Sequence, residues 1–184
     1  MMMATKIIMH TQIKTVVDSL QYLPLDWRVV PTFGKKPIEI NWQEKFNYSP
    51  AELQEKLVTN QMKIYLERSN RSVTPTGVAV VCGHHPQGNL IAVDCDGEAS
   101  WSNILELCEA SIPEKIEEIR SKALQFLPPT VAFTSGSSYR AQYLYLVPPE
   151  IPIKSIKLEK LELRGNHLAS VLPPSFHPKG RKYR

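Results

Sequence analysis

An apolar run that ends abruptly in two acidic residues is the feature that most constrains this chain. The run Leu90–Val93 has the length and composition of a buried strand, and Asp94 and Asp96 follow it directly before Gly97. Because side chains alternate between the two faces of a strand, both carboxylates point to the same face. Like charges so close repel each other unless positive charge lies between them. The pattern therefore indicates either a site for Mg²⁺ or Mn²⁺, which prefer oxygen ligands, or a solvated turn after a strand.

The bulk properties are those of an ordinary globular protein. The sequence has 184 residues, of which 42% are hydrophobic and 22% charged, so it suits a single domain over residues 1–184. The net charge of +4 permits a phosphate-bearing partner. No apolar run approaches the ~20 residues of a membrane span, and the three cysteines form no even disulfide set, so we expect a cytoplasmic protein with no membrane partner. We expect residues 1–10 to be disordered and the natural protein to continue beyond residue 184.

Hydrophobic spacing predicts a mixture of short helices and strands. Helical spacing of apolar residues occurs over residues 11–22, 49–60, 98–109 and 113–126. Strands are predicted over residues 26–31, 77–82, 89–97, 131–133, 140–146, 161–165 and 168–172. Because strand pairs and helices alternate irregularly, we predict an α+β fold, with a mixed or antiparallel sheet that carries the acids and helices packed on its outer face.

Single residues define several boundaries of these elements. Ser49 and Glu52 have the spacing of a capping box at the start of a helix. Pro31 is expected to end the first strand. Residues 67–75 are polar and lack a hydrophobic period, so they are predicted to form a loop.

Two hairpins are predicted from strands that follow one another closely. A polar turn separates 77–82 from 89–97, and the pair Gly165–Asn166 separates 161–165 from 168–172.

Small and basic residues supply candidate phosphate contacts. The turn after the strand 131–133 runs from Thr134 to Ser138 and includes Ser135, Gly136 and Ser137. Its hydroxyl and backbone N–H groups suit a phosphate, although a plain hairpin loop has the same composition. Lys35 and Lys36 form a basic turn that suits a phosphate or is simply solvated.

Two strands carry charged or polar residues that share a face. Arg140 and Gln142 alternate along one predicted strand. Glu162 and Arg164 do so on another, where they form either a weak ion pair on an exposed face or the third carboxylate that the Asp94–Asp96 pair would need.

A zinc site is a weaker alternative for one cluster. Cys82, His84 and His85 lie close in sequence, but no second pair of ligands stands at zinc-binding spacing. A polar turn beside a buried cysteine is the favoured interpretation.

In their order, these motifs resemble the bifunctional primase–polymerase domain of the archaeo-eukaryotic primase superfamily. The resemblance covers the chain from about residue 20 to its end. The matching residues are Trp27, Val29, Pro31, Gly34-Lys-Lys-Pro37, Trp42, Asp94, Asp96, Thr134-Ser-Gly136, Glu162 and Pro173-Pro-Ser-Phe-His-Pro-Lys-Gly-Arg-Lys-Tyr183.

The chain departs from the family pattern at two positions. Gln142 stands where the family commonly carries a histidine that contacts the triphosphate, and Gln142 donates a hydrogen bond but carries no charge. Arg140, two residues earlier, is expected to supply that charge. Glu162 stands where aspartate is common. The Arg140-x-Gln142 and Leu161-Glu-Leu-Arg164 versions resemble cyanobacterial or plasmid-type members.

The resemblance implies DNA primase or polymerase activity by two-metal nucleotidyl transfer, in the replication of a plasmid, phage or mobile element. Asp94, Asp96 and Glu162 would hold two Mg²⁺ or Mn²⁺ ions. The partners implied are a DNA template and primer, nucleoside triphosphates, and a downstream helicase or accessory domain. Expected nucleotide contacts are Ser135, Gly136, Ser137, Arg140, Gln142, Arg164 and His177. Expected nucleic-acid contacts are Lys35, Lys36, Lys179, Arg181 and Lys182.

Other functions use the same residue types. A metal-dependent nuclease needs the same acids, and a sugar-nucleotide glycosyltransferase also places Asp-x-Asp after an apolar strand. With Gln142, the domain could instead bind nucleic acid or nucleotide without catalysis. Retention of three carboxylates favours an active enzyme, because an unused acidic cluster costs stability. His177 and Ser175 in the last motif fit a structural turn or a nucleotide contact equally well.

Overall fold

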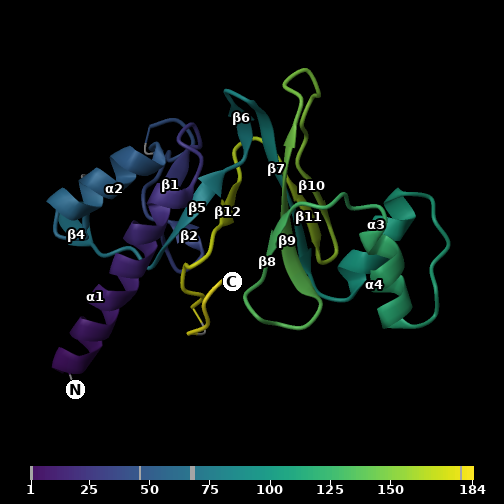
Figure 1. Ribbon diagram of the computed structural model, residues 1–184, viewed down its shortest axis with the longest axis horizontal. Helices are drawn as coiled ribbons and strands as arrows, with labels where there is room; N and C mark the ends of the chain where they lie inside the picture. The colour runs from purple at the N-terminus through teal and green to yellow at the C-terminus, as the bar shows by residue number, and fades with distance from the viewer. Residues whose placement is uncertain (1, 46, 67–68, 179) are drawn as a thin grey trace. The chain divides into compact units, whose positions relative to one another are not determined.

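The computed structural model describes residues 2–45, 47–66, 69–178 and 180–184, and it divides the chain into two compact units (Figure 1). Unit 1 comprises residues 1–81 and 167–184, and unit 2 comprises residues 82–166. Along the sequence, unit 2 is continuous and lies between the two segments of unit 1. The single domain over residues 1–184 stays a prediction.

Unit 1 is built around a four-stranded antiparallel sheet. The strand order is β12-β5-β1-β2. Its elements are α1 (Met2–Ser19), a 3₁₀ turn η1 (Leu20–Tyr22), β1 (Val29–Phe33), β2 (Lys36–Pro37), α2 (Pro50–Thr59), β3 (Ile64–Leu66), β4 (Arg71–Val73), β5 (Gly77–Val81) and β12 (Ala169–Val171). All five residues of β5 are buried, so this strand lies at the centre of the core of unit 1.

Unit 2 is built around a second antiparallel sheet. The order is β10-β11-β7-β9-β8, with β6 also paired to β7. Its elements are β6 (Gly83–His85), β7 (Gly88–Asp96), α3 (Ala99–Leu107), α4 (Ile116–Leu124), β8 (Val131–Phe133), β9 (Arg140–Val147), β10 (Ile156–Leu158) and β11 (Leu161–Arg164). Figure 1 shows α3 and α4 together beside this sheet. The predicted α+β fold, with an antiparallel sheet and helices on its outer face, is therefore confirmed.

The helix layer of unit 2 covers one face of the sheet. Trp101, Ile104 and Leu105 of α3 are buried against Cys95 of β7 and Leu161 of β11. Each of these side chains gains stability from removing apolar surface from water, at about 25 cal/mol per Å². The acidic residues adjacent to Cys95 and Leu161 must then point to the opposite face.

The start of α2 forms as the sequence predicts. The Ser49 side chain accepts a hydrogen bond from the Glu52 backbone N–H, and the Glu52 carboxylate accepts one from the Ser49 backbone N–H. This capping box lowers the pKa of Glu52, mainly through the hydrogen bond from the Ser49 backbone.

Both predicted hairpins are wrong, since their strands belong to different sheets. The strand β5 pairs with β1 and β12, and the hairpin partner of β7 is the short strand β6. Gly83, the first residue of β6, has a φ of +112°, which only glycine adopts easily. Likewise β11 pairs with β7 and β10.

Smaller predictions were also wrong. Pro31 lies inside β1 and does not end it. Its carbonyl accepts a hydrogen bond from the Ile38 N–H, on the side of β1 that faces β2. Because β2 is only two residues long, the missing N–H of Pro31 costs little there. Part of the predicted loop forms β4, which pairs with β3, while residues 67–68 lie outside the described residues. Helix α1 includes residues 2–10, which the sequence predicted to be disordered.

Candidate active site

The predicted catalytic residues of unit 2 meet on three neighbouring strands. Across the antiparallel pairs, Asp94 of β7 lies directly opposite Gln142 of β9 and Glu162 of β11. Asp96 lies opposite Arg140. Residues directly opposite each other in an antiparallel pair project to the same face, so all five side chains share one face. This face is the one that the helices leave uncovered.

The alternate residues explain why the acids face outward. Cys95, between the two aspartates, is buried against α3, and burial raises the pKa of its thiol to about 12. Tyr143, the neighbour of Gln142, packs edge-on against Trp101 with their ring centroids 6.4 Å apart. The apolar packing of the odd-numbered positions thus determines the orientation of the polar ones.

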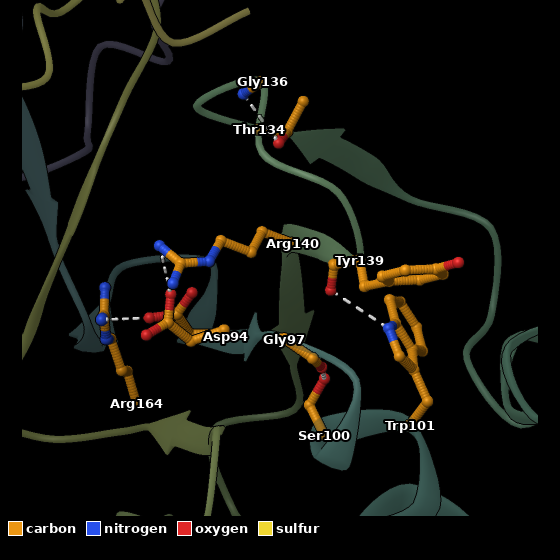
Figure 2. Close-up of polar contacts among 10 residues, drawn as sticks. Asp94, Gly97, Ser100, Trp101, Thr134, Gly136, Tyr139, Arg140 and Arg164 are labelled. Atoms are coloured by element: carbon orange, nitrogen blue, oxygen red, sulfur yellow. Dashed lines mark hydrogen bonds and ion pairs between the residues drawn. The ribbon is translucent and has the colours of Figure 1, made fainter. Parts of the chain in front are cut away.

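Arg164 lies between two of the three carboxylates. Its Nη2 donates a hydrogen bond to Asp94 (Figure 2). Its Nε donates to Glu162 Oε2 at 2.7 Å. The side chains of Arg164 and Asp94 are only 18% and 15% exposed. Burial alone would lower the pKa of Arg164, but the adjacent Asp94 and Glu162 carboxylates outweigh it and raise the pKa above its usual value. The guanidinium therefore stays charged and offsets one of the two negative charges of Asp94 and Glu162.

Arg140 provides the counter-ion of the third carboxylate. Its Nη1 lies 3.1 Å from Asp96 Oδ1, and the two side chains are 36% and 48% exposed. A pair with this exposure contributes at most about 1 kcal/mol, so Arg140 is free to exchange Asp96 for another anion at small cost.

The donor chemistry of this face suits a divalent cation, whereas the side-chain positions do not. Carboxylate oxygens are the preferred ligands of Mg²⁺ and Mn²⁺. Within the described ranges, however, no three carboxylate, imidazole or thiol groups lie close enough together to hold a metal ion. Arg164 already occupies the space between Asp94 and Glu162. The same finding disfavours the zinc alternative at Cys82, His84 and His85.

An open cavity of about 620 Å³ lies at the end of β7, within the size range of small-molecule sites. Asp96, Arg140 and Lys160 line it together with Ser138 and the residues that begin α3. The backbone N–H of Asp96 donates to the carbonyl of Lys160 at 2.7 Å, which holds the β10–β11 turn at the edge of the cavity. Among the described residues, the charged side chains around the cavity are thus two cations, Arg140 and Lys160, and three carboxylates, Asp96, Glu98 and Glu159.

Two cavity residues were missed by the sequence analysis. Lys160 occupies a tight turn with a φ of +57°, and Tyr139 also has a positive φ, of +57°. The carbonyl of Tyr139 accepts a hydrogen bond from Trp101 Nε1 at 3.1 Å (Figure 2). Neither residue has a sequence signal beyond its proximity to a predicted strand, because their positions depend on the pairing of those strands.

The small-residue turn has its own internal hydrogen bonds. The backbone N–H of Gly136 donates to Thr134 Oγ1 at 3.1 Å, and Gly136 has a φ of +80° (Figure 2). Ser135 is buried. The carbonyl of Ser137 accepts weakly from the Arg140 backbone N–H, at 3.4 Å. Of this turn, Ser138 lines the cavity, whereas Ser135, Gly136 and Ser137 do not.

The remaining predicted contacts belong to unit 1. These residues are Lys35, Lys36, His177, Arg181 and Lys182, while Lys179 lies outside the described residues. The backbone N–H of His177 donates to the Arg181 carbonyl at 2.7 Å, and its ring centroid lies 6.0 Å from that of Tyr183.

Ser175, in the same C-terminal motif, is fully buried. Its hydroxyl accepts from the Val78 N–H at 2.9 Å and donates to the Val78 carbonyl at 3.1 Å. A Cβ on Gly77 would lie 2.5 Å from that of Ser175, so the close approach requires glycine. These contacts assign Ser175 a structural role.

A comparison with protein families agrees with this arrangement. The model of the family "Bifunctional DNA primase/polymerase, N-terminal" matches residues 19–184. The chain belongs to this family. No curated protein and no solved structure matches the chain.

Membership of the prim-pol family has consequences for the chemistry. It implies a nucleotidyltransferase that acts on DNA and nucleotides. Within the part of this prim-pol domain that the structure describes, no helix is long and apolar enough to cross a membrane.

Proposed function

We propose that this prim-pol domain catalyses template-dependent nucleotidyl transfer as a DNA primase, a DNA polymerase or both. The observation that carries the proposal is the register that aligns Asp94, Asp96 and Glu162 on the uncovered face of the unit 2 sheet. Family membership supplies the reaction class.

The three carboxylates are the proposed ligands of Mg²⁺ or Mn²⁺. When bound, a pair of divalent cations supplies activation of the 3′-hydroxyl and charge neutralisation at the leaving pyrophosphate. Because Arg164 already contacts Asp94 and Glu162, these carboxylates become available to a metal only when the guanidinium turns away.

The cations of this face are the proposed triphosphate contacts. Arg140 and Arg164 can each contact phosphate oxygens through two N–H groups. Lys160 and the hydroxyl of Ser138 extend this set around the cavity beside Asp96. Arg140 is the first candidate, because its exposed ion pair with Asp96 is the easier one to replace.

The biological setting completes the proposal. We assign the activity to replication of a plasmid, phage or mobile element in the cytoplasm, with a helicase or accessory domain as a partner downstream.

Primer extension tests the proposed chemistry. A labelled primer–template is incubated with each set of nucleotides and with Mg²⁺ or Mn²⁺. Asp94→Ala and Asp96→Ala should each reduce extension about 1,000-fold, since the loss of metal stabilisation is several kcal/mol. Glu106→Ala, an exposed carboxylate on α3, serves as the matched control and should extend normally.

The other outcomes discriminate among the competing functions. Normal extension by either aspartate variant would show that the metal assignment is wrong. A shortened strand would support a nuclease. Unchanged length with salt-sensitive binding would support a non-catalytic binding module. An unprimed template then distinguishes priming from extension.

A further inference from the structure

Two hairpins of unit 1 line a groove that the proposed chemistry does not use. The groove has a volume of about 490 Å³ and lies between the β1–β2 and β3–β4 hairpins. Phe33 and Lys36 contribute from the first hairpin, and Leu66, Arg71 and Ser72 from the second. All of these residues belong to unit 1, so the groove is complete within one compact unit.

Phe33 is an exposed aromatic ring beside a lysine. Its exposed fraction is 57%, although most phenylalanines are buried. It is directly opposite Lys36 in the register of the hairpin, so the two side chains project from the same face with Cβ atoms roughly 5 Å apart. The turn between them is closed by Gly34, whose φ of +61° suits a tight hairpin.

The charge of the groove has one sign. Within the described ranges, Lys36 and Arg71 are the charged residues that line it, and both are exposed. Among the residues that the structure describes, neither of them forms an ion pair. Two exposed cations without an ion-pair partner in the described part of the chain favour an anionic ligand.

Together these features match the chemistry of an unpaired nucleotide. A base stacks on an exposed aromatic ring, and the phosphates on either side of it contact basic side chains. In a duplex the faces of the bases are already stacked on one another, so an aromatic platform selects single strands. We propose that this groove binds single-stranded DNA, with a base stacked on Phe33 and with Lys36 and Arg71 contacting neighbouring phosphates.

This proposal rests on the proposed function, because a template-dependent enzyme must hold an unpaired template strand. Beyond the proposed function, it specifies a base stacked on Phe33, a second phosphate contact at Arg71 and a preference for single strands.

Equilibrium binding of a fluorescent 20-nucleotide DNA to the full chain tests the stacking. Phe33→Ala should weaken binding about tenfold, because one base–aromatic stack contributes ~1–3 kcal/mol. Phe33→Trp should retain the affinity of the wild-type chain. The matched control is Tyr22→Ala, which removes another exposed ring of unit 1 and should bind normally.

An abasic oligonucleotide isolates the contribution of the base. The wild-type chain should bind it more weakly than the normal strand, and Phe33→Ala should cause no further loss. An equal loss on both oligonucleotides would mean that Phe33 supports the fold of the hairpin instead of stacking, and would overturn the proposal.

Salt dependence tests the two cations. Lys36→Ala and Arg71→Ala should each reduce the slope of log affinity against log salt by about 0.7, the value for one phosphate contact on a single strand. Lys14→Ala, an exposed cation on α1, should leave the slope unchanged.

Other nucleic acids and the extension assay separate the remaining outcomes. Equal affinity for duplex DNA, or tighter binding of RNA of the same sequence, would overturn the assignment to single-stranded DNA. Normal binding by all three groove variants would overturn the groove while leaving the proposed function intact. Groove-dependent binding without any extension would instead leave the groove intact and reject the proposed function.

Discussion

Arg164 of β11 donates a hydrogen bond to the carboxylate of Asp94 on β7, although the two residues are 70 positions apart in the chain. The same guanidinium also contacts Glu162, so the acidic face carries its own counter-ion. An acidic cluster can therefore be stable in the absence of metal, and any divalent cation must compete with an arginine for the same oxygens.

Removing Arg164 should destabilise unit 2. We expect Arg164→Met to lower the free energy of unfolding by about 1–3 kcal/mol, since Asp94 and Glu162 would then repel each other in a partly buried position. Urea unfolding measures the change. The double variant Asp94→Asn/Arg164→Met should recover much of the loss, and strictly additive effects would argue against the coupling.

The same substitution should strengthen metal binding. Without the competing guanidinium, we expect Arg164→Met to bind Mn²⁺ about tenfold more tightly than the wild-type chain in the absence of nucleotide. Calorimetry or the resonance of free Mn²⁺ gives the affinity. Weaker binding by Arg164→Met would mean that Arg164 organises the ligands and does not compete with the metal.

Gln142 lies opposite Asp94 on the uncovered face, which makes its substitution informative. We expect Gln142→His to fold normally and to preserve extension or raise it up to about tenfold, because a histidinium can add one charge-assisted hydrogen bond to a phosphate. The gain should be larger at pH 6 than at pH 8, where the imidazole is neutral. Michaelis constants for the nucleotide at both pH values test this, with Gln142→Asn as the control. Loss of the folded state would contradict the placement of Gln142 on the uncovered face.

Stability should decrease in alkaline solution through a buried thiol. Burial raises the pKa of Cys82 from 9.0 to about 12, so between these values the unfolded chain has released a proton that the folded chain keeps. Stability from this thiol is therefore complete below pH 9 and decreases by about 1.4 kcal/mol per pH unit up to pH 12. Unfolding curves from pH 8 to pH 10.5 should show a shallower decrease for Cys82→Ala, and an unchanged slope would show that the thiol is not the cause.

The sequence predicted those parts of the site that depend on alternation along one strand. Asp94 and Asp96 share a face because they are two residues apart, and Glu162 and Arg164 do so for the same reason. The contact of Arg164 with Asp94 could not be predicted from the sequence. It depends on the register between β7 and β11, which the sequence of neither strand determines by itself.

The pairing partners of the strands were predicted wrongly for a related reason. A hydrophobic pattern shows that a strand is buried but does not identify its neighbour, so β5 and β7 were paired with each other because they are adjacent in sequence. The lining of the groove at Phe33 was missed as well, since part of β3–β4 was predicted to be a loop. The helices were predicted more accurately than the strand pairs, because a capping residue such as Ser49 forms its hydrogen bonds with residues only a few positions away.

The insertion of unit 2 between two segments of unit 1 has a consequence for biosynthesis. The ribosome makes residues 82–166 after β5 and before β12 and Ser175, and both of these contact β5. The edge of β5 therefore has no β12 to pair with for as long as the residues of unit 2 are being synthesised. Exposed edges of this kind pair readily with other chains, so the interval between the synthesis of β5 and β12 is when this protein most needs a chaperone.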